Sequence, residues 1–265
     1  MESKKLYKNT FYDVIADNYD YDYKGYMHNI RRISTDLLKK HRYKFNHFFD
    51  PLCGSGKAVS FCNSVLNIEK ITVNDFSKEM LNVAKRNCPN ANIVCSDINS
   101  AVEETFKNKF DGMQISIPGS FVDLDKLFKN SYSWLKDDGV LIYITSRSDT
   151  FSELYTGDFS RNSWIFNSKK ATNHLPKDEK SINNKMEKIG FQLLDQKLIE
   201  FECTAETPEE MKQFAIYSSW AEPFFSNKTK LMIYVTSFVF WLTKHFKFIA
   251  PKKATARVIV SIYKK

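Results

Sequence analysis

Short apolar runs alternate with stretches of helical spacing between residues 43 and 147. The runs at 43–49, 92–98 and 110–116 have the length and the residue types of buried strands. Segment 57–66 instead repeats its apolar residues at the period of a helix. This alternation predicts an α/β domain in which a parallel sheet carries helices on both faces.

The pattern continues toward the C-terminus. Residues 181–189 have helical spacing that ends at Gly190, and the segment that follows begins a sixth strand. We expect a last strand at 257–263, antiparallel and beside the sixth. The predicted fold class is therefore a Rossmann-like, seven-stranded, mostly parallel sheet with helices on both faces and an antiparallel last strand.

Two appended segments flank this core. We divide the chain into an N-terminal helical lid (1–42), a core (43–204), a helical, aromatic insertion (205–251) and the last core strand (252–265). The insertion is interpreted as a cover on the core, as the wall of a ligand pocket, or as a membrane-surface or dimer-forming face. Its apolar stretch at 231–242 is too short to cross a membrane, because a spanning helix needs about 20 apolar residues.

An acid and two glycines connect the first strand to the first core helix, in the order Asp50-Pro51-Leu52-Cys53-Gly54-Ser55-Gly56. The glycines allow backbone angles that other residues avoid, and they let a ligand approach a helix N-terminus. The turn is not a phosphate-binding P-loop, because Ala58 stands where that motif needs Ser or Thr. It is not a dinucleotide fingerprint either, because Val59 replaces the third glycine.

The turn closely resembles the first motif of class I S-adenosylmethionine-dependent methyltransferases, Asp-x-Gly-Cys-Gly-Ser/Thr-Gly, with Leu52 in place of the first glycine. The resemblance continues in order through 71–81, where Ser77 is expected to cap a helix, through 92–98 and 110–116, and through 134–141, expected as the turn into the fifth strand. It therefore covers roughly residues 43–147. It implies a methyltransferase core that binds S-adenosylmethionine. It also implies that Asp75, at the expected distance from the glycine turn, holds the ribose hydroxyls, and that Asp97 accepts from the adenine amino group.

The N-terminal stretch 12–20 resembles the Tyr-Asp-x-x-Ala-x-x-Tyr-Asp segment that lies over the cofactor in many small-molecule methyltransferases. Tyr12 and Tyr19 are two helical turns apart and so project from one face, although an ordinary packing helix would show the same spacing. We expect residues 6–28 to become ordered when the cofactor binds. The resemblance places the cofactor site at Tyr12, Tyr19, Asp50, Leu52, Cys53, Gly54, Gly56, Asp75, Phe76, Met80, Asp97, Ile98 and Ser116.

Charge, cysteine content and histidine spacing bear on the partners, the compartment and the metal content of the protein. The formal net charge of +8 could indicate a polyanion groove, but the lysines are spread along the chain, which favours a solvated surface. Five cysteines without a Cys-x-x-Cys pair, and no apolar core of signal-peptide length near Met1, predict reduced thiols and a cytoplasmic protein. The five histidines have no metal-ligand spacing, so we expect no metal.

The resemblance implies methyl transfer to a small-molecule acceptor at O, N or C by in-line displacement, with the protein aligning the reactants and excluding water. A hydroxyl, carbon acid or protonated amine acceptor also needs a base. His28 and His174 are candidates by residue type, since histidine titrates near neutrality, although each could be an ordinary surface histidine.

Two other functions stay open. Asp-Pro-Leu-Cys-Gly-Ser-Gly also resembles the Asp-Pro-Phe-Cys-Gly-Ser-Gly motif of enzymes that methylate exocyclic amines of nucleic-acid bases. Those enzymes grip a flipped base with Asn/Asp-Pro-Pro-Tyr/Phe after the fourth strand, where this chain has Ser116-Ile117-Pro118-Gly119. The glycine lost at Leu52 motivates a third hypothesis, a catalytically silent binding partner with the same fold, and the intact Asp75 and Asp97 argue against it.

Overall fold

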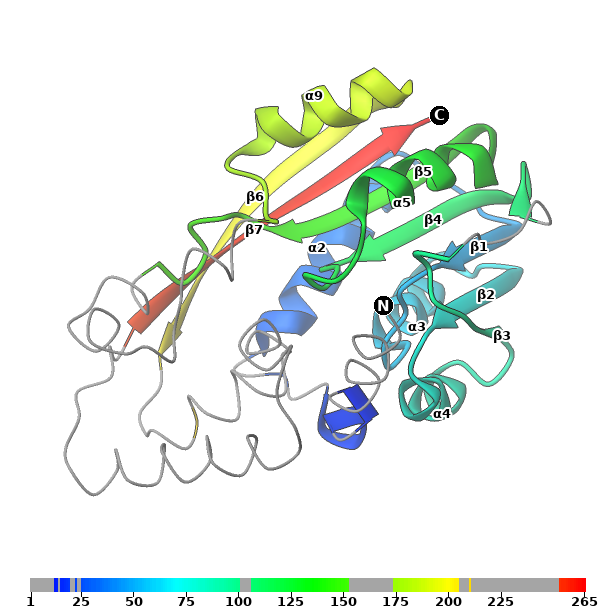
Figure 1. Ribbon diagram of the computed structural model, residues 1–265, viewed down its shortest axis with the longest axis horizontal. Coiled ribbons are helices and arrows are strands. Elements are labelled where there is room, and N and C mark those ends of the chain that lie inside the picture. Colours follow the sequence, from blue (N-terminus) through cyan, green and yellow to red (C-terminus); the bar gives the residue numbers. More distant parts are fainter. Residues whose placement is uncertain are drawn as a thin grey trace.

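A seven-stranded sheet forms the centre of the computed structural model, with helices on both of its faces (Figure 1). The structure describes residues 12, 13, 15–19, 22, 25–100, 106–152, 174–204, 210 and 253–265. Within these residues the strand order is β3-β2-β1-β4-β5-β7-β6. The strands are β1 (His47–Asp50), β2 (Lys70–Asp75), β3 (Asn92–Cys95), β4 (Phe110–Ser116), β5 (Leu135–Ser146), β6 (Gln192–Thr204) and β7 (Lys253–Lys264).

The first five strands pair in parallel, and β7 pairs antiparallel with both β5 and β6. Parallel strands covered on both faces must be apolar on both, and all four residues of β1 are buried. The predicted fold class is therefore confirmed, including the antiparallel last strand beside the sixth.

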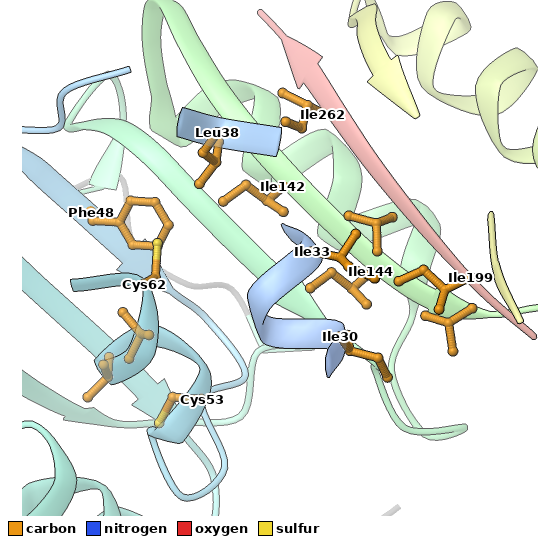
Figure 2. Close-up of a cluster of buried hydrophobic side chains, with 14 of the residues drawn as sticks. Ile30, Ile33, Leu38, Phe48, Cys53, Cys62, Ile142, Ile144, Ile199 and Ile262 are labelled. Carbon is orange, nitrogen blue, oxygen red and sulfur yellow. The ribbon is translucent and has the colours of Figure 1, made fainter. Parts of the chain in front are cut away.

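Two hydrophobic clusters fill the two faces of the sheet, because successive side chains of a strand point to opposite sides. Phe48 and Ile142 belong to one cluster, whereas their neighbours Phe49 and Leu141 belong to the other. Figure 2 shows the first cluster, in which Ile30, Ile33 and Leu38 approach the sheet from helix α2.

Five helices cover the sheet in the part of the chain that the structure describes. Helices α2 (Tyr26–Lys40), α3 (Lys57–Leu66) and α4 (Lys78–Asn87) contribute to the first cluster, and α5 (Leu124–Trp134) and α9 (Glu179–Ile189) contribute to the second. Helix α4 begins at the predicted cap, Ser77, whose hydroxyl accepts from the Met80 N–H at 3.1 Å. Helix α9 ends at Gly190 as predicted.

The boundaries of two strands differ from the sequence-based expectation. Strand β1 begins at His47 rather than at residue 43, because Tyr43 and Phe45 stack on each other instead of pairing with β2. The turn expected at 134–141 lies inside β5 as a bulge: Phe110 pairs with Leu135 but Gly112 pairs with Val140. The bulge therefore takes up the polar residues that the sequence suggested as a loop.

The appended segments are described only in part. In the lid, a 3₁₀ turn η1 (Ala16–Asn18) precedes α2. The insertion lies outside the described residues apart from Glu210, and the strands that flank it pair with each other from Thr204 and Lys253 onward. No helix within the described ranges is long and apolar enough to cross a membrane.

Candidate cofactor and active site

The glycine turn lies at the carboxyl end of β1 and leads into α3. Gly54 and Gly56 have φ of 51° and 75°, in the left-handed region that favours glycine. The Gly56 N–H donates to the Cys53 carbonyl at 2.8 Å. A Cβ on Gly56 would lie 3.1 Å from both Cα and Cβ of Ala84 in α4, so the turn also needs a residue without a side chain.

Leu52 fits this turn although related motifs have glycine there. The φ angle of Leu52 is not positive, so its backbone conformation does not require glycine. Its N–H donates to the Asp50 carboxylate at 3.2 Å, and its side chain packs against the second hydrophobic cluster. The departure from the motif therefore leaves the turn intact.

Asp75 ends the neighbouring strand β2 and faces the glycine turn. One carboxylate oxygen accepts from the Gly54 N–H and the other from the Ser77 N–H, each at 2.9 Å. Burial raises the pKa of Asp75 to about 6, against the lowering effect of these two backbone hydrogen bonds. A carboxylate can accept about four hydrogen bonds, so this one is held firmly and still has capacity for ligand hydroxyls.

Asp50 and Cys53 lie buried beneath the same turn. The pKa of Asp50 is raised to about 7, mainly by burial and also by the nearby Asp75, against the lowering effect of the hydrogen bond from Leu52. The pKa of the Cys53 thiol lies well above its usual range, mainly because of burial. Cys53 is therefore a small packed thiol rather than a nucleophile.

Asn74 joins three segments at this edge of the sheet, and sequence reasoning did not single it out. Its amide donates to the Pro51 carbonyl at 3.0 Å and to the Ser96 carbonyl at 3.2 Å, while its oxygen accepts from the Ser96 hydroxyl at 2.7 Å. The sequence feature that could have identified it is an amide side chain at the end of an otherwise apolar strand. Asn74 fixes the glycine turn relative to the end of β3.

An aromatic cluster borders the site on the side of β3 and β4. Tyr12 contacts Tyr19, Phe76 and Phe121 edge to face, with ring centroids 6.1, 5.6 and 5.8 Å apart. The Tyr19 ring lies against the glycine turn, 3.1 Å from where a Cβ on Gly54 would be. Phe121 was missed by the sequence analysis because it lies in a loop of no regular period.

The remaining cofactor candidates lie around the same strand ends. Asp97 follows β3, and its carboxylate accepts from the Asn99 N–H at 3.0 Å, while Ile98 is buried in the second cluster. Met80 is buried in the first turn of α4, and Ser116 ends β4 half-buried. The structure therefore brings the predicted cofactor residues to one edge of the sheet, where ligands of such folds bind.

The two candidate bases lie in different places. His28 is exposed in the first turn of α2, with its ring 5.5 Å from that of Phe61. His174 is half-buried in a loop that touches the end of β5, where the Ser148 N–H donates to the Pro176 carbonyl at 2.8 Å. Its Nδ1 has no hydrogen-bond partner among the described residues, and burial lowers the pKa of its ring.

A cluster of charges lies beyond the carboxyl end of β5. The Arg147 guanidinium donates to both carboxylate oxygens of Asp149, at 2.6 and 2.7 Å. From β7, Arg257 donates to the Glu200 carboxylate at 3.1 Å and to the Asp149 carbonyl at 3.0 Å. At this edge a glycine turn and buried carboxylates lie on the side of β1 to β4, and two ion-paired arginines lie on the side of β5 to β7.

A glycine turn that faces a fixed carboxylate at this edge of a Rossmann-like sheet is an arrangement suited to binding a nucleoside. The model of the methyltransferase domain family matches residues 49–139. A malonyl-[acyl-carrier protein] O-methyltransferase of Bacillus anthracis is 27% identical over 215 residues, which cover 78% of this chain and 71% of the relative. An enzyme of the same name from Halalkalibacterium halodurans is 33% identical over 109 residues, 39% of this chain and 40% of the relative.

Solved structures share the fold at lower identity. A Bacillus halodurans C-125 protein that has been assigned as a methyltransferase superposes with a TM-score of 0.57 at 15% identity, covering 88% of this chain and 98% of that one. The cyclase SpnF superposes with a TM-score of 0.53 at 16% identity, covering 89% and 81%. These structures show the fold alone, because one fold can carry different reactions.

Residues 49–139 match a methyltransferase domain, and the chain is an S-adenosylmethionine-dependent methyltransferase. Its methyl donor is S-adenosylmethionine. The glycine turn and the buried carboxylate of Asp75 fit a nucleoside with two ribose hydroxyls.

Proposed function

We propose that this methyltransferase transfers a methyl group to a carboxylate oxygen of a short acyl group that is carried as a thioester. The relatives from two bacteria are named for O-methylation of a malonyl group on an acyl-carrier protein, and a malonyl thioester has one free carboxylate. The single observation that carries the proposal is the pair of arginines, Arg147 and Arg257, beyond the end of β5.

In this proposal the glycine turn and Asp75 hold the cofactor. Asp75 accepts the ribose hydroxyls, Asp97 and Ile98 border the adenine, and Phe76 packs on it. Bound S-adenosylmethionine supplies an electrophilic methyl group on a sulfonium, which an oxygen placed in line with the carbon–sulfur bond takes while the electron pair stays on sulfur.

Arg147 receives the acceptor carboxylate. Ile144 pairs with Ser116, so Arg147 lies three residues, or about 10 Å, further along the strand direction than the end of β4. A guanidinium has five N–H donors, and the pair with Asp149 uses two of them. Arginine binds carboxylates in a forked geometry that lysine cannot reproduce, so the residue type suits this acceptor.

A carboxylate acceptor needs no general base, because it is already ionised near neutral pH. His174 would be needed only if the acceptor were a hydroxyl or an amine, since the proton must then leave the attacking atom. His28, which is exposed beside Phe61, would have to act at a distance from the strand ends. His174→Gln should therefore keep its activity within about fivefold if the acceptor is a carboxylate.

The test follows the labelled methyl group of S-adenosylmethionine into three acceptors: a malonyl group on an acyl-carrier protein, the same group on coenzyme A, and an amine of similar size. Mild alkali releases the methyl group of an ester as volatile methanol, whereas it releases a C-methylated malonyl group only as a non-volatile acid, through hydrolysis of the thioester. We expect volatile label from the malonyl acceptors after alkali. Label that stays non-volatile would overturn the carboxylate proposal.

Arg147 variants sharpen the test. Arg147→Ala should raise the KM for the acyl acceptor about tenfold or more and leave cofactor affinity unchanged, since a hydrogen-bonded charge pair is lost only on the acceptor side. Arg147→Lys should recover little of the loss. Asp149→Asn is the matched control, because it breaks the same ion pair but keeps the guanidinium. If Asp149→Asn impairs the acceptor as much as Arg147→Ala does, Arg147 is structural.

A further inference from the structure

Ser77 lies between the carboxylate of Asp75 and a second carboxylate from the N-terminal segment. The Ser77 N–H donates to Asp75, the hydroxyl oxygen accepts from the Met80 N–H, and the hydroxyl proton is donated to the Asp13 carboxylate. Ser77 is fully buried, so all of these groups are bonded within the protein. No conservative apolar replacement could keep the three contacts.

Asp13 is next to Tyr12, the centre of the aromatic cluster. Tyr12 packs on Phe76 and Phe121, and its partner Tyr19 lies over the glycine turn. The bond from Ser77 to Asp13 therefore joins the carboxylate at the end of β2 to the segment that covers the site. No local sequence pattern indicates this bond, because the two residues are 64 positions apart.

A second ion pair connects the same segment to α4 but differs in burial. Arg86 donates to Asp17 at 2.9 Å, with side chains 62% and 83% exposed. Exposed pairs of this kind contribute little, because water and salt screen them. A charge-assisted hydrogen bond to a buried hydroxyl is stronger, so the Asp13 contact is the stronger of these two polar contacts.

We propose that Asp13 and Ser77 are positioning residues that hold the Tyr12 segment in register with the Asp75 carboxylate, so that the cover and the ribose site form together. This inference rests on the proposed role of Asp75 and does not depend on the acceptor. It assigns a function to the acid of the N-terminal motif, which contacts a helix cap rather than the ligand. Loss of the link loosens the cover and weakens cofactor binding, although neither residue touches the cofactor.

The test measures the affinity of the full chain for S-adenosylhomocysteine by calorimetry, with melting temperature as a check on folding. Asp13→Ala should raise the Kd about tenfold or more, the scale of losing a hydrogen bond to a charged group. Asp13→Asn should stay within about threefold of the original protein, because its amide oxygen still accepts from Ser77. Asp17→Ala, the matched control on the same segment, should change the Kd less than about twofold.

Hydrogen exchange adds a readout of the cover itself. In Asp13→Ala the amides at 12–19 should lose protection with ligand bound, while those of α4 stay protected. An unchanged Kd for Asp13→Ala overturns the proposal, and so does an equal loss in Asp13→Ala and Asp17→Ala. Asp75→Ala is the reference. If this variant also binds S-adenosylhomocysteine normally, both the proposed ribose site and the proposed role of the Asp13–Ser77 link are wrong.

Discussion

The two halves of the ligand edge hold their charged groups in different ways. On the side of β1 to β4, the carboxylates of Asp50 and Asp75 are buried and accept from backbone N–H groups. On the side of β5 to β7, Arg147, Asp149 and Arg257 pair mainly through side chains, and the Glu200 side chain is 57% exposed. On the first side, backbone N–H groups hold the charged residues in place. On the second side, other side chains hold them.

This difference explains where the family pattern ends. The methyltransferase domain match covers 49–139 and stops before Arg147. Groups held by the backbone can change only if the turn itself changes. Side-chain pairs at a partly solvated edge can be replaced without disturbing the sheet, and this freedom lets related proteins accept different substrates.

The largest expected effect comes from a substitution in the glycine turn itself. Gly56→Ala should destabilise the protein by about 3 kcal/mol, because it combines a left-handed backbone angle with a 3.1 Å contact to Ala84. Gly25→Ala is the matched control: its φ is 76°, but nothing lies within 4 Å of the added Cβ, so about 1 kcal/mol is expected. Urea unfolding of both variants measures the difference, and equal losses would show that the Ala84 contact is unimportant.

The next effect concerns the ribose acid. Asp75→Ala should weaken S-adenosylmethionine binding by roughly 1.5 to 3 kcal/mol, the scale of lost hydrogen bonds to a charged acceptor. Asp149→Ala, the matched change on the side of β5 to β7, should leave the affinity for S-adenosylmethionine unchanged. Calorimetry on both variants measures the two cofactor affinities. A larger loss in Asp149→Ala than in Asp75→Ala would place the cofactor on the side of β5 to β7.

Buried Asp50 should make stability depend on pH. Its pKa is about 7 in the folded protein, above the value of an unfolded aspartate, so the folded state binds the extra proton between about pH 4 and 7. Stability contributed by this group is therefore full at low pH and falls as the pH rises toward 7. Asp50→Asn should be more stable than the original protein by a few kcal/mol at pH 8 and about equal to it at pH 4. A constant difference between pH 4 and pH 8 would contradict this account.

The smallest effect belongs to the exposed half. Glu200→Gln should change the free energy of unfolding by less than about 0.5 kcal/mol, because its pair with Arg257 is largely solvated. Raising the salt concentration should reduce even this difference. Denaturant titrations at low and high salt provide the measurement, and a salt-independent loss above about 1 kcal/mol would show that the pair is buried in solution.

The same contrast decides how much could be predicted from the sequence. The glycine turn, Asp75 and the cap at Ser77 follow local rules of backbone geometry and spacing, and the structure has them where they were expected. Asn74 and Phe121 were missed because their roles arise from strand ends that meet only in the folded sheet. The insertion at 205–251 remains a prediction as a cover on the core, a pocket wall, or a membrane-surface or dimer-forming face, since nothing in its composition fixes what it contacts.

The most direct test of the account is a crystal structure of the protein with S-adenosylhomocysteine. We predict that both ribose hydroxyls donate to the Asp75 carboxylate, that the Gly54 N–H keeps its bond to the same group, and that Tyr12 or Tyr19 touches the ligand. A nucleoside bound elsewhere, or one whose ribose lies beyond hydrogen-bond distance of Asp75, would contradict the claim that the backbone-held half of the edge is the cofactor site.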